Sequence, residues 1–179
     1  MPPARPTLDL TLPSDLGVLV IRSLSDADGN DLQRLCERCH DYFELVTGLA
    51  VGGAEAQSLF SGLPPGKMND DKFLFGVFRS SALVGVIDLI RDWRRERSWT
   101  LGLLLLDPAI RGHGVGRALV GLLDAWIGAQ GATSFRLGVV ERNSRAVLFW
   151  RGLGFQEIDR TESEQGLTLT MERPVGTAP

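Results

Sequence analysis

Three apolar strands in succession, at residues 72–78, 83–90 and 99–106, constrain the fold of this chain more than any other feature. A short polar break separates the first two and predicts a β-hairpin. A glycine-rich turn follows the third, and a long segment with apolar residues at helical spacing leads to another strand at 135–140. Few common folds place three consecutive strands before a β-α-β unit. We therefore expect an α/β fold of the α+β kind, with a mixed sheet flanked by helices.

The flanking segments complete this order. Apolar spacing predicts a strand at 18–22 and a helix through residues 32–43, and a shorter helix is expected at 54–60. After the β-α-β unit we expect a helix at 144–153 and a terminal hairpin from strands 155–159 and 167–171. At 179 residues the chain suits one domain, predicted over residues 17–173 with flexible tails at 1–16 and 174–179.

Composition excludes few functions. The chain has 44% hydrophobic and 23% charged residues and a net charge of −3, which favours neither nucleic acid nor an anionic membrane as a partner. The N-terminal residues contain no long apolar run, so neither a signal peptide nor a membrane anchor is expected. Two cysteines, Cys36 and Cys39, and two histidines supply a zinc site poorly, so we expect no metal. Buried, reduced thiols are the simpler interpretation and indicate a cytoplasmic protein.

The sharpest local feature is the glycine turn between the third strand and the long helix. It is composed of Arg111, Gly112, His113, Gly114, Val115, Gly116 and Arg117. Alternate glycines let a ligand approach the main chain closely, and a helix N-terminus offers unpaired N–H groups to an anion. Two arginines add charge that can pair with phosphate. The turn therefore predicts a pyrophosphate site, with a ligand-free structural turn as the alternative.

The spacing of the glycines narrows the choice of phosphate ligand. A dinucleotide-binding turn needs its third glycine two residues further on and usually opens the first β-α-β unit. A P-loop needs a lysine followed by serine or threonine, which this turn lacks.

The turn resembles the signature of the GNAT acetyltransferase superfamily, Arg/Gln-x-x-Gly-x-Gly/Ala. The strand before Pro108 also looks like the coenzyme-binding strand of that family, and Asn143-x-x-Ala146 with Phe149-Trp150-x-x-x-Gly154-Phe155 resembles its second coenzyme-contacting segment. The similarity covers residues 18–171. It implies a mostly antiparallel central sheet that splays after the coenzyme-binding strand, acetyl-CoA as the acetyl donor, and transfer to an amine.

The resemblance also implies which residues bind coenzyme A. Backbone groups of the strand would pair with the pantetheine arm, the turn would hold the pyrophosphate, and the following helix would lie along the arm with Trp150 nearest the thioester. The residues so implied are Leu104, Leu105, Leu106, Arg111, Gly112, His113, Gly114, Val115, Gly116, Arg117, Asn143, Ala146 and Trp150.

Catalytic residues are less evident. In many relatives a tyrosine occupies the position of Trp150 and protonates the departing thiolate, whereas an indole N–H is no practical acid. Tyr42, the chain's single tyrosine, is a substitute if its segment folds over the cleft. Asp88, which interrupts an apolar strand, and Glu141, which follows a strand, are candidate bases for deprotonating the amine.

Several alternatives stay open at this point. A non-catalytic acyl-CoA-binding or sensor domain of the same fold is the competing function, and an acyl donor longer than acetyl is a narrower variant. The acceptor is a small-molecule or peptide amine of unidentified structure, since a fold does not select its substrate. An exposed edge of the terminal hairpin is a candidate homodimer contact.

Overall fold

A computed structural model describes residues 7–163 and 166–176 of the chain. Their strands form one eight-stranded sheet in the order β1-β2-β3-β4-β5-β6-β8-β7. All neighbours are antiparallel except β5 and β6, which run parallel. The mixed, mostly antiparallel sheet is therefore confirmed. The strands are β1 (Leu10–Ser14), β2 (Gly17–Ser23), β3 (Lys72–Arg79), β4 (Ala82–Arg91), β5 (Ser98–Leu106), β6 (Ser134–Val140), β7 (Gln156–Ser163) and β8 (Gly166–Pro174).

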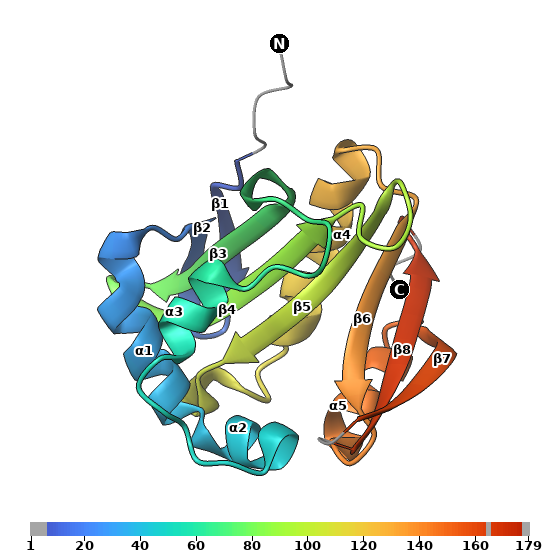
Figure 1. The fold of residues 1–179 in the computed structure, drawn as a ribbon. Helices are drawn as coiled ribbons and strands as arrows, with labels where there is room; N and C mark the ends of the chain where they lie inside the picture. The colour runs from blue at the N-terminus through green and yellow to red at the C-terminus, as the bar shows by residue number, and fades with distance from the viewer. Residues whose placement is uncertain (1–6, 164–165, 177–179) are drawn as a thin grey trace.

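Helices cover both faces of the sheet (Figure 1). On one face lie α1 (Gly29–Arg38), α2 (His40–Thr47) and α3 (Glu55–Ser61). On the other lie α4 (Val115–Ala129) and α5 (Ser144–Arg151). Short 3-10 turns at Asp26–Asp28, Asn69–Asp71 and Pro108–Ile110 complete the described elements. None of the helices in the described part of the chain is long and apolar enough to cross a membrane.

The hydrophobic core is divided by the sheet. The larger cluster joins the sheet to α4 and α5, and its centre is aromatic: the rings of Phe73 and Trp99 lie 4.9 Å apart, and those of Trp99 and Trp126 lie 5.2 Å apart. The smaller cluster joins the other face to α1 and α3 and contains both cysteines, which are buried and unpaired. Side chains from β5 therefore reach two separate cores.

The predicted tail of residues 1–16 is wrong where β1 forms. Residues Leu10 to Ser14 pair with β2 through a tight turn, at which Gly17 has φ of +97°. Leu8 is fully buried, and Thr7 accepts a hydrogen bond from the Trp126 indole at 3.3 Å. Pairing with β2, together with the buried Leu8, therefore orders this segment. Residues 1–6 lie outside the described part.

The C-terminal end of the domain also lies further along the chain than predicted. β8 runs to Pro174, and Gly176 donates its amide to the buried carboxylate of Asp124 at 2.8 Å. The same carboxylate accepts from Arg173 at 2.9 Å. The hydrogen bond from Gly176 thus holds a residue predicted as part of the tail, while 177–179 lie outside the description.

The predicted helix over residues 32–43 is two helices. Cys39 has non-helical dihedrals, and its amide donates to the carbonyls of both Leu35 and Cys36 before α2 begins. α2 therefore leaves the direction of α1, and it ends at Gly48, whose φ of +74° is left-handed.

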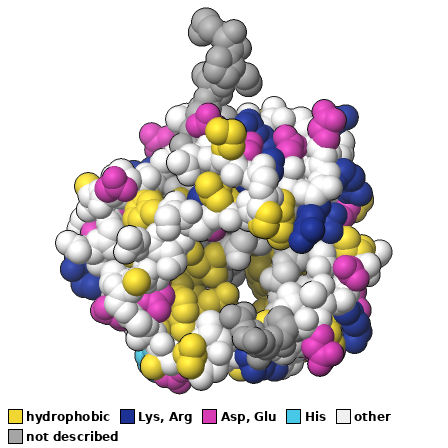
Figure 2. Space-filling view, viewed as in Figure 1, with side chains coloured by type: hydrophobic (Ala, Val, Ile, Leu, Met, Phe, Trp, Pro, Cys, Tyr) yellow, Lys and Arg dark blue, Asp and Glu magenta, His cyan; other side chains and the backbone are white. Residues whose placement is uncertain are grey.

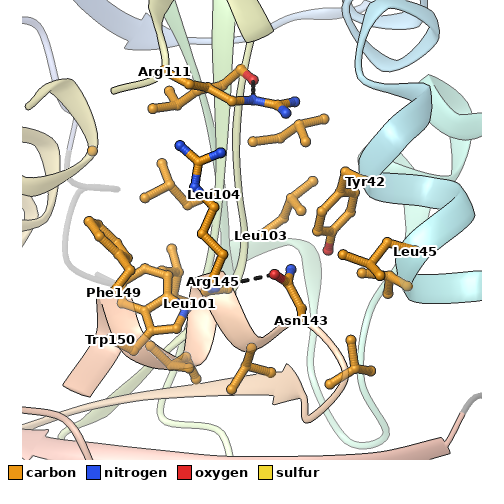
Figure 3. A pocket seen from close by; sticks show the side chains of 18 of the residues that line it. Tyr42, Leu45, Leu101, Leu103, Leu104, Arg111, Asn143, Arg145, Phe149 and Trp150 are labelled. Atoms are coloured by element: carbon orange, nitrogen blue, oxygen red, sulfur yellow. Dashed lines mark hydrogen bonds between the residues drawn. The ribbon is translucent and has the colours of Figure 1, made fainter. Parts of the chain in front are cut away.

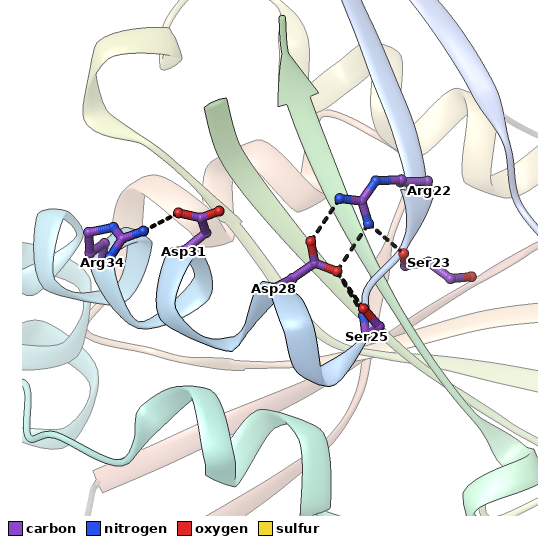
Figure 4. Close-up of polar contacts among 6 residues, drawn as sticks. All are labelled: Arg22, Ser23, Ser25, Asp28, Asp31 and Arg34. Atoms are coloured by element: carbon purple, nitrogen blue, oxygen red, sulfur yellow. Dashed lines mark hydrogen bonds and ion pairs between the residues drawn. The ribbon is translucent and has the colours of Figure 1, made fainter. Parts of the chain in front are cut away.

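Asp28 anchors the start of α1 to β2 (Figure 4). Its carboxylate accepts two hydrogen bonds from Arg22, at 2.7 and 3.1 Å, and one from the Ser25 amide at 2.9 Å. These bonds, led by that of Arg22, lower the pKa of Asp28 to about 2. Asp31 and Arg34, one turn further on, form an exposed ion pair.

Candidate active site

The sheet splays between β5 and β6. The two strands pair only from Ser98↔Ser134 to Leu101↔Leu137. Beyond that point β5 stays with β4, and β6 stays with β8, so a gap opens between the two halves of the sheet (Figure 1). A cavity of about 740 Å³ occupies the gap. It is lined by both strand edges, the glycine turn, α5 and α2.

The edge of β5 that faces the cavity presents backbone groups with no strand partner among the described residues. The Asp107 amide donates to the Val84 carbonyl, so the Gly85↔Leu106 pair is of the non-hydrogen-bonded type. Because such pairs alternate along an antiparallel ladder, the backbone groups of Leu104 and Leu106 point away from β4 and toward the gap. The predicted pairing with a pantetheine arm requires this orientation.

Leu105 is oriented differently from its two neighbours. Its backbone groups face β4, and its side chain is buried in the smaller core cluster, although the residue borders the cavity. The Leu106 carbonyl is also engaged, since it accepts from Arg111 Nε at 2.8 Å and from Cys39 Sγ at 3.4 Å. The groups that remain for an extended ligand are both backbone groups of Leu104 and the amide of Leu106.

The three glycines of the turn have two different structural roles. Gly112 and Gly114 have φ of +83° and +75°, and a Cβ added at either would meet no atom of the described residues within 4 Å. Gly114 is the N-cap residue of α4, so the first amides of the helix, which have no partner within the helix, follow directly after these bare positions. Gly116 differs, because a Cβ there would lie 3.3 Å from the Phe149 ring and would press α4 against α5.

The side chains of the turn differ in whether they line the cavity. Arg111 and Arg117 line the cavity, but Arg111 already binds both carboxylate oxygens of Asp41 on α2, one of them at 3.2 Å. His113 is exposed and Val115 is buried in the larger core, so neither side chain lines the cavity. Only their backbone amides are available for the predicted coenzyme contacts.

The α5 segment forms the wall opposite β5 (Figure 3). Asn143 caps the helix by accepting the Ala146 amide at 3.2 Å. Trp150 packs against the rings of Phe149 and Phe155, at 4.8 and 5.5 Å, and borders the cavity while being only 8% exposed. Asn143, Ala146 and Trp150 thus lie together on the cavity wall.

α2 closes the third side. Tyr42, Leu45 and Val46 all line the cavity, and Figure 3 shows the Tyr42 hydroxyl directed into it. Burial raises the pKa of Tyr42, which keeps the phenol protonated at neutral pH. Arg142 donates to the Val46 carbonyl at 2.7 Å, so arginines from both halves of the sheet hold the helix.

The two predicted bases lie outside the cavity lining. Asp88 is paired with Lys72, Nζ to Oδ2 at 2.7 Å, and its other oxygen is buried without a hydrogen bond from the part of the chain that the structure describes. Burial raises the pKa of Asp88, and the lysine ammonium opposes that shift. A Cβ at Gly102, which does line the cavity, would lie 3.3 Å from Asp88 Oδ2, so one bare glycine separates the carboxylate from the cavity. Glu141 is exposed, 3.5 Å from Arg160.

Sequence reasoning missed the side chains that complete the walls. Leu45 and Val46 from α2, Val139 and Val140 from β6, Arg145 from α5 and Thr168 from β8 border the cavity. No local motif marks them, because each depends on where a distant element packs.

The model of the acetyltransferase (GNAT) family matches residues 36–155 of the chain, which include β5, the turn and α5. The chain belongs to the GNAT acetyltransferase family. No curated protein sequence matches it.

Solved structures of acetyltransferases share the fold of this chain. An acetyltransferase from Thermus thermophilus is 22% identical with a TM-score of 0.70, over 87% of this chain and 96% of that one. A spermidine N-acetyltransferase from Vibrio cholerae, in complex with CoA and spermine, is 18% identical with a TM-score of 0.68, over 88% and 95%. An N-acetyltransferase from Thermoplasma acidophilum, in complex with coenzyme A, is 21% identical with a TM-score of 0.62, over 87% and 98%. At these identities they establish the fold alone.

Proposed function

We propose that this GNAT-family chain is an N-acetyltransferase that binds acetyl-CoA in the splayed cavity and passes the acetyl group directly to an amine. One observation supports this most strongly. The open backbone groups of Leu104 and the open amide of Leu106 precede the bare glycine turn by one short 3-10 turn, and the strand edge and the glycine turn border one cavity. An extended arm that ends in a pyrophosphate matches that succession of an open strand edge and a helix N-terminus.

Open space beside the glycine turn supports this placement of the pyrophosphate. The positions of a Cβ at Gly112 and Gly114 are empty, so main-chain amides of the turn are accessible to phosphate oxygens. Arg117 and Arg145 also border the cavity and add positive charge to its lining. Arg111, in contrast, acts mainly by fixing α2 through Asp41.

In the proposed reaction the neutral amine nitrogen attacks the thioester carbonyl carbon, a C–N bond forms and the C–S bond breaks. The thiolate that leaves takes a proton, and the new amide nitrogen loses one. Tyr42 is the proposed proton donor, because its hydroxyl points into the cavity and its raised pKa keeps it protonated. Trp150 then serves as an apolar wall rather than an acid.

The proton from the amine needs an acceptor. Asp88 is the better of the two predicted bases, because it lies directly beneath Gly102 and the Lys72 ammonium favours its ionised form. It would act through water across the bare glycine. Glu141 is less suitable, since it is exposed and close to Arg160.

Thermal unfolding with separate ligands tests the coenzyme site. A ligand present at 100 times its Kd adds about 2.7 kcal/mol, which corresponds to a shift of roughly 5–10 °C for a chain of this size. Acetyl-CoA and coenzyme A are expected to stabilise the protein, and NAD and ATP at the same concentration are not. A shift with NAD alone, or none with either coenzyme A species, would contradict the assignment.

The competing function is a non-catalytic acyl-CoA-binding or sensor domain. Trp150 favours it, because the indole replaces the tyrosine acid found in many relatives of this family. Release of free coenzyme A thiol with a panel of amines separates the two: an enzyme turns over, whereas a sensor binds without release. A cytoplasmic location and a homodimer through β7, the outer strand of the terminal hairpin, stay proposals as well.

A further inference from the structure

The cavity extends past the splay onto the face of the sheet that α2 covers. Side chains alternate along β6: Leu137 and Val139 belong to the core with α4 and α5, so Val140 points to the opposite face. Its partner across the ladder, Thr168 of β8, points the same way. Leu103 of β5 packs with the cluster of the α1 and α3 side.

These residues and α2 define a compartment that we call the acceptor chamber. Its members are Tyr42, Leu45, Val46, Leu103, Val140 and Thr168, all of which line the cavity. Four of the six are aliphatic, and two offer hydroxyl groups. Figure 2 shows hydrophobic side chains gathered in the hollow of this face.

Charge in the lining does not favour a polycation. Among the described lining residues the single carboxylate is Asp41, and Arg111 already binds both of its oxygens. Arg111, Arg117 and Arg145 border the same cavity. A ligand with a second ammonium group would have to bury that charge against aliphatic walls without a free counterion, which is costly.

We propose that the acceptor is a primary amine attached to an apolar body, such as an alkylamine or arylalkylamine. The apolar body lies between α2 and β6, against Leu45, Val46 and Val140, and the amino group faces the splay. This inference rests on the proposed function, because it identifies the second substrate of the same site.

An isosteric pair of amines tests the acceptor class directly. n-Hexylamine and 1,5-diaminopentane have the same length and differ in a terminal methyl group against a terminal ammonium. We expect kcat/KM for hexylamine to exceed that for the diamine by at least about 100-fold, because only the diamine must bury a charge. Along the series from propylamine to hexylamine, kcat/KM is expected to rise about fourfold per methylene, the factor for burying one CH₂.

A matched pair of variants locates the effect. Leu45 and Leu49 lie four residues apart and are 41% and 69% exposed, but only Leu45 lines the cavity. Leu45→Ser is expected to flatten the dependence on alkyl length without weakening coenzyme A binding. Leu49→Ser is expected to match the wild type in both measurements.

The outcomes distinguish this inference from the proposed function. If the diamine is acetylated as well as hexylamine, the acceptor class is wrong while the transferase stands. If rate depends on acyl length in the donor and not on amine length, the chamber holds the acyl chain and the inference is overturned. If coenzyme A binds but no amine is acetylated, both transfer and the acceptor class fail. The shift in Tm that each alkylamine causes in the absence of coenzyme A tests binding in the acceptor chamber even if coenzyme A does not bind. Shifts that do not increase with alkyl length would overturn the inference.

Discussion

Gly114→Ala separates the backbone requirement of the turn from its ligand contact. Gly114 has φ of +75°, a region that costs an L-residue about 1–2 kcal/mol. The new methyl group would meet no protein atom, because it projects to the open side of the turn where we place the pyrophosphate. If it displaces the phosphate from one backbone amide, the loss of a charged hydrogen bond is about 1.5–3 kcal/mol, or roughly 10–150-fold in Kd.

Gly131→Ala is the matched control. Gly131 follows the other end of α4, has φ of +83°, and its added Cβ also meets nothing within 4 Å. Both variants should therefore lower Tm by a similar amount, about 2–8 °C. Isothermal titration with coenzyme A should show weaker binding for Gly114→Ala alone. Equal affinities in the two variants, whether reduced or not, would refute the assignment of the turn.

Four further substitutions test individual side chains. Asp28→Asn should lower the free energy of unfolding at pH 6 by about 1 kcal/mol, since the partner arginine is partly exposed. Because the folded pKa of Asp28 is depressed to about 2, this stability is present above pH 4 and is lost as the pH falls toward 2, so urea midpoints of variant and wild type should converge there. Tyr42→Phe should lower kcat at least about 100-fold with coenzyme A affinity intact, and a wild-type kcat would exclude it as the acid. Trp150→Phe should leave kcat nearly unchanged if the indole only packs; a large fall would assign a role to its N–H. Asp88→Asn should lower kcat and remove the acidic limb of the pH–rate profile, and an unaltered profile would exclude it as the base.

The elements that the sequence predicts well are those fixed by local patterns. β3, β4 and β5 are continuous apolar runs, and each is found within one or two residues of its predicted bounds. The start of α4 at Val115 follows from the glycine turn, because Gly114 is where the chain needs a left-handed backbone.

The elements that the sequence misses depend on distant contacts. β1 is short and contains Pro13, and it is ordered by pairing with β2. The division between α1 and α2 at Cys39 leaves no break in the apolar spacing. Arg111 was expected to pair with phosphate, but its nearest anion is Asp41, seventy positions earlier in the chain. Such partners follow from packing and not from spacing.

The two halves of the site should differ in how their ligand binding responds to substitution. The proposed coenzyme half is made largely of backbone groups from one contiguous stretch, which runs from β5 through the turn into α4. A substitution there changes coenzyme binding only if it alters the backbone φ or adds a Cβ at a glycine of the turn. The acceptor chamber is made of side chains from α2, β6 and β8, which meet only in the folded chain. α2 has no fully buried residue and is held by hydrogen bonds from Arg111 and Arg142. Leu45 and Val46 can therefore change at little cost to the core, whereas Tyr42 packs against the smaller cluster. Acceptor preference should therefore respond to α2 substitutions while coenzyme affinity does not.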